Sequence, residues 1–107
     1  MNQRLKENFK KMIAQYKASV YLLTGFKVEM GTEPERPKLK IRSMYAENEG
    51  DFLLFRYDED DKLQLLESEY AKTIDPQSFQ YLNVCHSIPA FLSNVTLSLF
   101  DKQTFLG

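Results

Sequence analysis

MNQRLKENFKKMIAQYKASVYLLT, residues 1–24, is the stretch with the clearest periodicity in the chain. Its apolar residues recur alternately four and three positions apart, with one serine among them. This stripe consists of Leu5, Phe9, Met12, Tyr16, Ser19 and Leu23. A narrow apolar stripe that repeats about every 3.5 residues is typical of a coiled-coil seam. The pattern predicts a helix of roughly 36 Å at about 1.5 Å per residue, with its seam against a second copy of itself.

The chain of 107 residues has the length of one small domain, and its 43% hydrophobic content is enough for a compact core. The formal net charge of −1 argues against a general binder of nucleic acids or acidic membranes. No apolar run approaches the roughly 18 residues of a membrane span. Because the coiled-coil pattern is already under way at residue 2, we expect the chain to be a fragment of a longer protein.

After Gly25, which suits the left-handed position that follows a helix end, the period changes to two. The alternation predicts strands over residues 26–30, 39–45, 52–57 and 63–66. The first strand is expected to bury one face, and the nearly all-apolar third strand is expected to be central. Short turns between consecutive strands favour an antiparallel meander.

Two helices are predicted after the strands. Asp75-Pro76 is a helix start, and the helix that it opens is expected to bury Phe79 and Leu82, with Tyr81 as a further candidate. A final helix begins near Ser87, and its apolar face contains Ile88, Phe91, Leu92, Val95, Leu99 and Phe100. The predicted fold class is α+β, with a coiled-coil stalk over residues 1–24 and a head over residues 25–107.

The sequence offers little for catalysis. Cys85 and His86 are adjacent, and neighbours on a helix point about 100° apart, so they rarely form a nucleophile–base pair. We expect Cys85 to pack as a small apolar group near a helix end and His86 to be exposed. The acidic run at residues 58–61 lacks the ligand spacing of a calcium loop and is expected to be a solvated turn. We predict no enzyme activity, no metal and no cofactor.

The cations of the first helix are more informative. Arg4 and Lys6 lie on either side of Leu5, a seam residue. In a parallel dimer both copies of these cations would lie at one level of the stalk, and an arginine there can grip a phosphate with two hydrogen bonds. The alternative is that Arg4 and Lys6 are ordinary solvated positions beside a coiled-coil seam. A basic helix could also meet nucleic acid, but the low net charge and the lack of a basic stripe on the strands argue against that.

Five blocks of sequence fall in the order and spacing of one known domain. They are NQRLKENF (2–9), LTGFKV (23–28), SMYAENEGDFLLF (43–55), LQLLESEY (63–70) and SIPAFLSNVTLSLFDKQT (87–104). Together they resemble the C-terminal domain of the long coiled-coil member of the mitotic arrest-deficient, or Mad, family of checkpoint proteins. The resemblance covers nearly the whole chain.

The resemblance implies a parallel homodimer with an RWD-like head and no enzymatic activity. It implies a spindle assembly checkpoint adaptor that reaches unattached kinetochores by binding a phosphorylated motif of the Bub-family checkpoint kinase. The family's arginine-leucine-lysine contact corresponds to Arg4, Leu5 and Lys6 here, with Arg4 at the phosphothreonine. A family threonine that is itself phosphorylated corresponds to Thr104, in the expected C-terminal tail.

The resemblance also implies partners and a location. The family supports the conformational conversion of a HORMA-domain partner and its loading onto the activator of the anaphase-promoting complex. The expected location is the nucleus, with the kinetochore in mitosis and the nuclear envelope or nuclear pore in interphase.

The alternative function is a purely structural head that joins two coiled coils without a phosphopeptide ligand. The expected dimer seam is Leu5, Phe9, Met12, Tyr16 and Leu23.

Overall fold

The computed structural model describes residues 2–106, so Met1 and Gly107, the outer bounds of the two predicted domains, lie outside the described residues. Its first element is the helix α1 (Gln3–Thr24), which the Asn2 side chain caps by accepting a hydrogen bond from the Arg4 N–H at 2.7 Å. The helix ends at Gly25, whose φ of 78° would strain any residue with a side chain. The predicted helix and its glycine end are confirmed.

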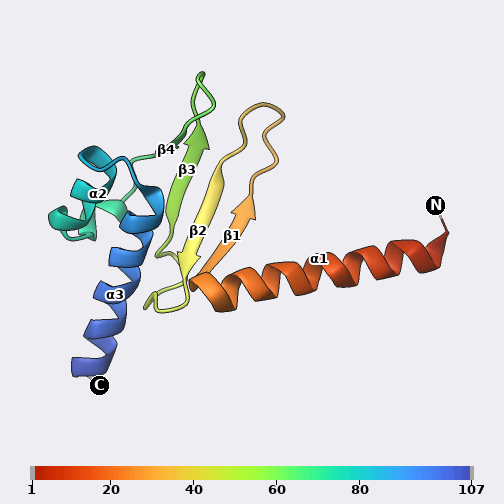
Figure 1. Cartoon of the computed structure of the whole chain (residues 1–107), viewed down its shortest axis with the longest axis horizontal. Coiled ribbons are helices and arrows are strands. Elements are labelled where there is room, and N and C mark those ends of the chain that lie inside the picture. Colours follow the sequence, from red (N-terminus) through yellow and green to blue (C-terminus); the bar gives the residue numbers. More distant parts are fainter. Residues whose placement is uncertain (1, 107) are drawn as a thin grey trace.

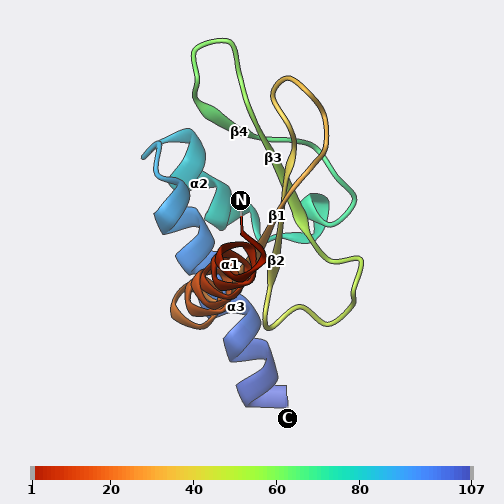
Figure 2. The same cartoon turned by 90° about the vertical axis from the view of Figure 1, so that its right-hand side faces the viewer.

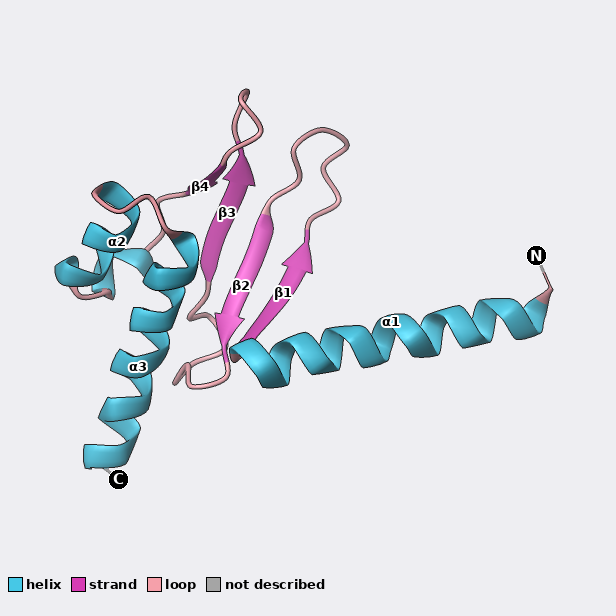
Figure 3. Cartoon of the chain, viewed as in Figure 1, coloured by secondary structure: helices cyan, strands magenta, loops and turns pink. Residues whose placement is uncertain are grey.

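Four strands follow and form one antiparallel sheet in the order β1-β2-β3-β4. They are β1 (Phe26–Met30), β2 (Leu39–Ser43), β3 (Leu53–Tyr57) and β4 (Leu63–Leu65). Figure 3 shows this sheet in magenta between α1 and the C-terminal helices. The predicted meander is confirmed, and β2, β3 and β4 are each slightly shorter than their predicted spans.

The remaining elements are helical: two 3-10 turns, η1 (Ala71–Thr73) and η2 (Pro76–Ser78), and two α-helices, α2 (Phe79–Asn83) and α3 (Ile88–Leu106). The start predicted at Asp75 is correct, because its carboxylate accepts a hydrogen bond from the Gln77 N–H at 2.9 Å. The chain forms the 3-10 turn η2 before it widens into the short α2.

The core lies between one face of the sheet and α3, which packs across that face (Figure 1 and Figure 2). Its buried apolar side chains are Phe26, Leu39, Ile41, Leu53, Phe55, Ala71, Phe91 and Val95. Phe55 of β3 and Phe91 of α3 have no exposed area. The central place predicted for the third strand is thereby confirmed, since β3 supplies two of the most deeply buried side chains.

Two expectations about the strands were wrong. Val28 is 44% exposed and Met30 67% exposed, so β1 buries only Phe26 of its apolar face. The physical reason is that β1 is an edge strand, and α3 does not reach across it. The opposite face of the sheet has an excess of positive charge, because the two-residue period brings cations from three strands to it: Lys27, Lys40, Arg42 and Arg56. Glu29 lies on the same face and forms an ion pair with Lys27 at 3.2 Å. Only the net charge of −1 then disfavours nucleic acid as a ligand.

The acidic run at residues 58–61 is a hydrogen-bonded turn between β3 and β4. The Asp58 carboxylate accepts hydrogen bonds from the N–H groups of Lys62 at 3.0 Å and Asp60 at 2.8 Å, and from the Gln64 amide at 2.9 Å. These bonds, that of the Lys62 N–H above all, lower the pKa of Asp58 because they stabilise the charged carboxylate. The expectation of a solvated turn is confirmed.

The first helix extends away from the rest of the molecule. Figure 1 shows α1 leaving the sheet beside β1 and carrying the N-terminal end far from α3. In Figure 2 the same helix is viewed almost along its axis. The molecule measures 51 × 40 × 23 Å along its principal axes, and α1 accounts for much of the longest dimension.

Candidate functional site

The apolar stripe of α1 has no partner within residues 2–106. Its large side chains are all exposed, from 55% for Leu5 to 86% for Leu23. The others of the predicted seam are Phe9, Met12 and Tyr16. Fully burying one such side chain is worth about 1.5–3 kcal/mol, so a helix that leaves five of them in water is a surface suited to association.

A groove extends this stripe onto the head. It lies in the angle between α1 and β1, has a volume of about 1050 Å³, and opens beside the seam. Ile13, Tyr16 and Val20 line it from α1, and the exposed Val28 and Met30 line it from β1. Four charged residues, Lys17, Lys27, Glu29 and Arg42, also line the groove. The edge of the sheet and the base of the helix therefore form a mainly apolar surface with charged side chains at its border.

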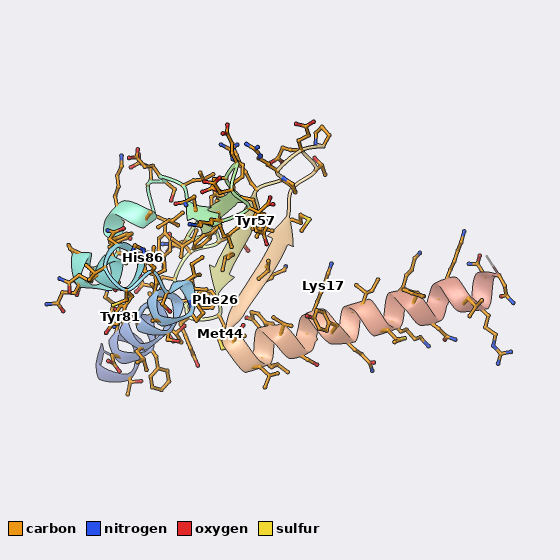
Figure 4. The ribbon with its side chains drawn as sticks, turned by 45° about the horizontal axis from the view of Figure 1, so that its top comes forward. Lys17, Phe26, Met44, Tyr57, Tyr81 and His86 are labelled. Atoms are coloured by element: carbon orange, nitrogen blue, oxygen red, sulfur yellow. The ribbon has the colours of Figure 1, made fainter. Side chains whose placement is uncertain are left out.

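The three residues of the candidate phosphate contact lie in the first turns of α1. Arg4, Leu5 and Lys6 are all exposed. At about 100° per residue, Arg4 and Lys6 lie on opposite flanks of Leu5, roughly 200° apart. Neither cation forms an ion pair within residues 2–106, so both charges are available to an external anion. Figure 4 shows how side chains along the helix, such as that of Lys17, extend into open space.

Thr104 lies inside α3, not in a tail after it. Its side chain is exposed, and its hydroxyl donates a hydrogen bond to the Phe100 carbonyl oxygen at 2.9 Å. The amino end of α1 and the carboxyl end of α3 lie at opposite ends of the molecule in Figure 1. One chain therefore does not bring Thr104 together with Arg4 and Lys6.

The expectation for Cys85 was wrong, because its side chain is exposed and not packed. α2 ends just before it, where His86 takes a left-handed φ of 54° and the Ser87 N–H donates to the Tyr81 carbonyl oxygen at 2.8 Å. His86 is exposed, as predicted, and Tyr81 is also exposed at the edge of the core; both are labelled in Figure 4. Cys85 and His86 therefore lie where the chain leaves α2.

Other kinds of site find little support in the described part of the chain. Residues 2–106 contain no group of three histidine, cysteine, aspartate or glutamate side chains placed to hold a metal ion. Among the same residues, none of the helices combines the length and the apolar character needed to cross a membrane.

Comparison with known proteins identifies relatives over almost the full chain. A family model described as mitotic checkpoint protein (MAD) matches residues 1–104. The human mitotic spindle assembly checkpoint protein MAD1 is 41% identical over 105 residues, which cover 96% of this chain and 14% of that protein. The Arabidopsis thaliana mitotic spindle checkpoint protein MAD1 is 30% identical over 110 residues, covering 95% of this chain and 15% of the relative.

A fungal relative also bears the name of a spindle checkpoint protein. The spindle assembly checkpoint component MAD1 of Yarrowia lipolytica is 28% identical over 109 residues, which cover 94% of this chain and 14% of that protein. The chain therefore spans about a seventh of the length of these relatives.

Proposed function

The chain belongs to the mitotic checkpoint protein (MAD) family, and from that membership we propose that it is a dimeric, non-enzymatic adaptor domain of the spindle assembly checkpoint. The resemblance read from the sequence is confirmed at the level of the family by the match over residues 1–104. In this proposal residues 1–24 form the stalk, residues 25–107 form an RWD-like head, and the domain acts by binding.

The proposed dimer is parallel and uses the stripe on α1. Leu5, Phe9, Met12, Tyr16 and Leu23 would be covered by the same residues of a second copy. The support is their exposure, together with the apolar groove that begins at Ile13 and Tyr16 and reaches Val28 and Met30. The head would add to the interface through this groove, which explains why an edge strand keeps apolar side chains in the open.

The proposed ligand is a phosphothreonine peptide, the phosphorylated motif of the Bub-family checkpoint kinase. A single observation carries this proposal: Arg4 and Lys6 flank an exposed seam residue and have no ion-pair partner in residues 2–106. Parallel pairing would place two arginines and two lysines at one level of the stalk. Leu5 would contribute an apolar contact beside the phosphate, and Arg4 would bind the phosphate itself with two hydrogen bonds.

Replacing Arg4 by alanine tests this assignment. A hydrogen bond to a charged group contributes about 1.5–3 kcal/mol, so Arg4→Ala is expected to weaken the phosphopeptide roughly 10- to 150-fold in Kd. Fluorescence anisotropy with the labelled phosphorylated kinase peptide measures the loss. Arg4→Lys should fall between wild type and alanine, because lysine keeps the charge but not the planar pair of donors.

Lys11→Ala is the matched control, since it removes one exposed cation from α1 two turns away from Arg4. It is expected to change Kd by no more than about twofold, as a general electrostatic effect of one exposed charge. An Arg4→Ala variant that binds as tightly as the Lys11→Ala variant would show that Arg4 does not contact the phosphate.

The remaining family roles extend the proposal. Phosphorylation of Thr104 would replace its hydrogen bond to Phe100 by a group of nearly two negative charges at the carboxyl end of α3, where the helix dipole disfavours them. We propose that this loosens the helix end for a partner. That step would support conversion of the HORMA-domain partner and its loading onto the activator of the anaphase-promoting complex. The proposed location is the nucleus, with the kinetochore as the site of action in mitosis.

One alternative also has support in the structure. The mainly apolar surface of α1 and β1 would by itself suit a purely structural head that joins two coiled coils. Such a head would form the same dimer but would bind phosphorylated and unphosphorylated peptides equally weakly. The Arg4 experiment separates the two functions, because a structural head gives the same result with or without Arg4.

A further inference from the structure

A second groove lies on the side of the head that carries α3. It has a volume of about 740 Å³. Three segments that are distant in sequence form its walls: the connection between β2 and β3, the stretch that contains η1 and η2, and the middle of α3. None of the residues assigned above to the dimer or to the phosphate contact lines this groove.

The floor of the groove is apolar. Val95 is buried, and Ile74 and Leu99 are partly buried against the core but still line the open space. Tyr70 stands beside them, half-buried. A floor of this kind holds an apolar side chain of a ligand and removes its surface from water.

The rim of the groove is acidic. It carries four carboxylates, those of Glu47, Asp51, Glu69 and Asp75, against the single ammonium group of Lys102. Of the four, only Glu69 has an ion-pair partner within residues 2–106, the Lys72 ammonium at 3.4 Å on the exposed side. The Arg42 guanidinium also lies near the rim, since it donates to the Asn48 carbonyl oxygen at 3.2 Å. The four carboxylates outnumber the nearby cations, so the rim keeps an excess of negative charge.

Local hydrogen bonds fix two of these carboxylates in place. Asp51 accepts from the Asn48 N–H at 3.2 Å and Asp75 from the Gln77 N–H at 2.9 Å, which orients both groups without cancelling their charge. Burial raises the pKa of Tyr70, and the charges of Asp51 and Glu47 raise it further, against a smaller opposing effect of Arg42. Carboxylates from the β2–β3 connection thus act on a hydroxyl at the floor, as expected if rim and floor form one site.

We propose that this groove binds a linear basic segment of a partner protein, with an apolar side chain on the floor and lysine or arginine side chains against the rim. Charge complementarity selects this occupant, because an acidic rim repels acidic and phosphorylated segments. The surface is opposite in charge to the Arg4 and Lys6 site. The domain would therefore hold a phosphorylated segment at the stalk and a basic segment at the head.

The test uses a synthetic peptide with a pair of arginines on each side of a central phenylalanine, added to the isotopically labelled chain. Amide shifts in the nuclear magnetic resonance spectrum are expected to change in residues 47–51, 69–78 and 95–102. Replacing the phenylalanine by glycine should remove the changes at Ile74 and Leu99. Shift changes that spread over the acidic surface without reaching these residues would overturn the proposal.

Charge reversal on the rim gives the second part of the test. Glu47→Lys combined with Glu69→Lys is expected to weaken peptide binding about tenfold, since two attractive charges become repulsive. The matched control is Glu59→Lys with Asp60→Lys, which makes the same change in charge at the exposed β3–β4 turn and should alter Kd by no more than about twofold. Equal weakening by both pairs would overturn the proposal. If the rim variant does not fold, Glu47→Gln with Glu69→Gln replaces it. The expected loss of peptide affinity is then smaller, and a loss no larger than that of the control pair would again overturn the proposal.

Discussion

Replacing Phe9 by aspartate is expected to convert the chain from a dimer to a monomer at micromolar concentration. Phe9 is 60% exposed in a single chain and lies in the middle of the apolar stripe on α1. In a parallel pair the two Phe9 side chains face each other, and burying each contributes about 1.5–3 kcal/mol. Losing both and placing two carboxylates together should weaken the dimer at least about a hundredfold. Light scattering should report a mass that falls from twice 12.6 kDa to 12.6 kDa.

Ala14→Asp is the matched control for this experiment. It introduces the same residue into the same helix at an exposed position, but on the face opposite the stripe. Its cost is limited to helix propensity, so the Ala14→Asp variant should keep the dimer mass. A Phe9→Asp variant that stays dimeric while the spectrum of the head is unchanged would show that the stripe is not the interface.

Replacing Phe91 by alanine is expected to have the largest effect on folding. The Phe91 ring has no exposed area and packs against the Phe79 ring with their centres 5.4 Å apart, at the contact between α3 and the rest of the core. Deleting a buried phenylalanine side chain costs about 3–5 kcal/mol, because the lost burial is joined by a cavity that the neighbours fill only in part. In a domain of this size that is a large share of the free energy of unfolding, which is typically about 5–15 kcal/mol.

Chemical denaturation at a fixed chain concentration measures this change, since the stability of a dimer depends on concentration. Phe100→Ala is the matched control on the same helix. The Phe100 ring is 45% exposed and meets the Tyr45 ring edge-on with centres 5.5 Å apart. Its removal should lower the free energy of unfolding by about 0.5–1.5 kcal/mol for the lost ring contact, in addition to the contribution of its partly buried area. Equal losses from Phe91→Ala and Phe100→Ala would contradict the location of the core.

Local patterns in the sequence are sufficient to predict most of the fold. The three-and-four spacing of α1, the glycine at residue 25 and the two-residue period of the strands each depend on one segment at a time. Asp75 and Ser87 also act locally: Asp75 accepts from the Gln77 N–H, and the Ser87 hydroxyl accepts from the Ala90 N–H at 3.1 Å. These features could be predicted because the atoms that form them are close together in sequence.

Features that depend on which elements meet could not be predicted in this way. The exposure of Val28 and Met30 follows from the reach of α3 across the sheet, which no local period encodes. Cys85 is exposed just after the end of α2, where His86 has a left-handed φ of 54°, and the apolar period of the sequence does not encode this helix end. The acidic groove is lined by residues up to about fifty positions apart in the sequence. Only the folded chain brings their carboxylates together around one apolar floor.

The candidate phosphate contact was accessible to sequence analysis because it occupies one turn of one helix. Arg4, Leu5 and Lys6 are neighbours in the chain, and helical geometry alone assigns them to two flanks and a seam. The expected C-terminal tail around Thr104 was wrong, since α3 continues past it to Leu106. The apolar pattern of α3 weakens after Phe100, which leaves the position of its end to tertiary contacts such as the hydrogen bond from the Gln103 amide to the Tyr45 carbonyl oxygen at 2.9 Å.

A calorimetric titration with the kinase peptide in phosphorylated and unphosphorylated forms shows whether α1 recognises the phosphate. We expect measurable binding of the phosphorylated peptide to the dimer and a loss of at least about tenfold in affinity without the phosphate, because charge-assisted contacts from Arg4 and Lys6 depend on it. Equal affinities for the two forms would contradict a phosphate-reading site on α1, whatever the oligomeric state of the chain.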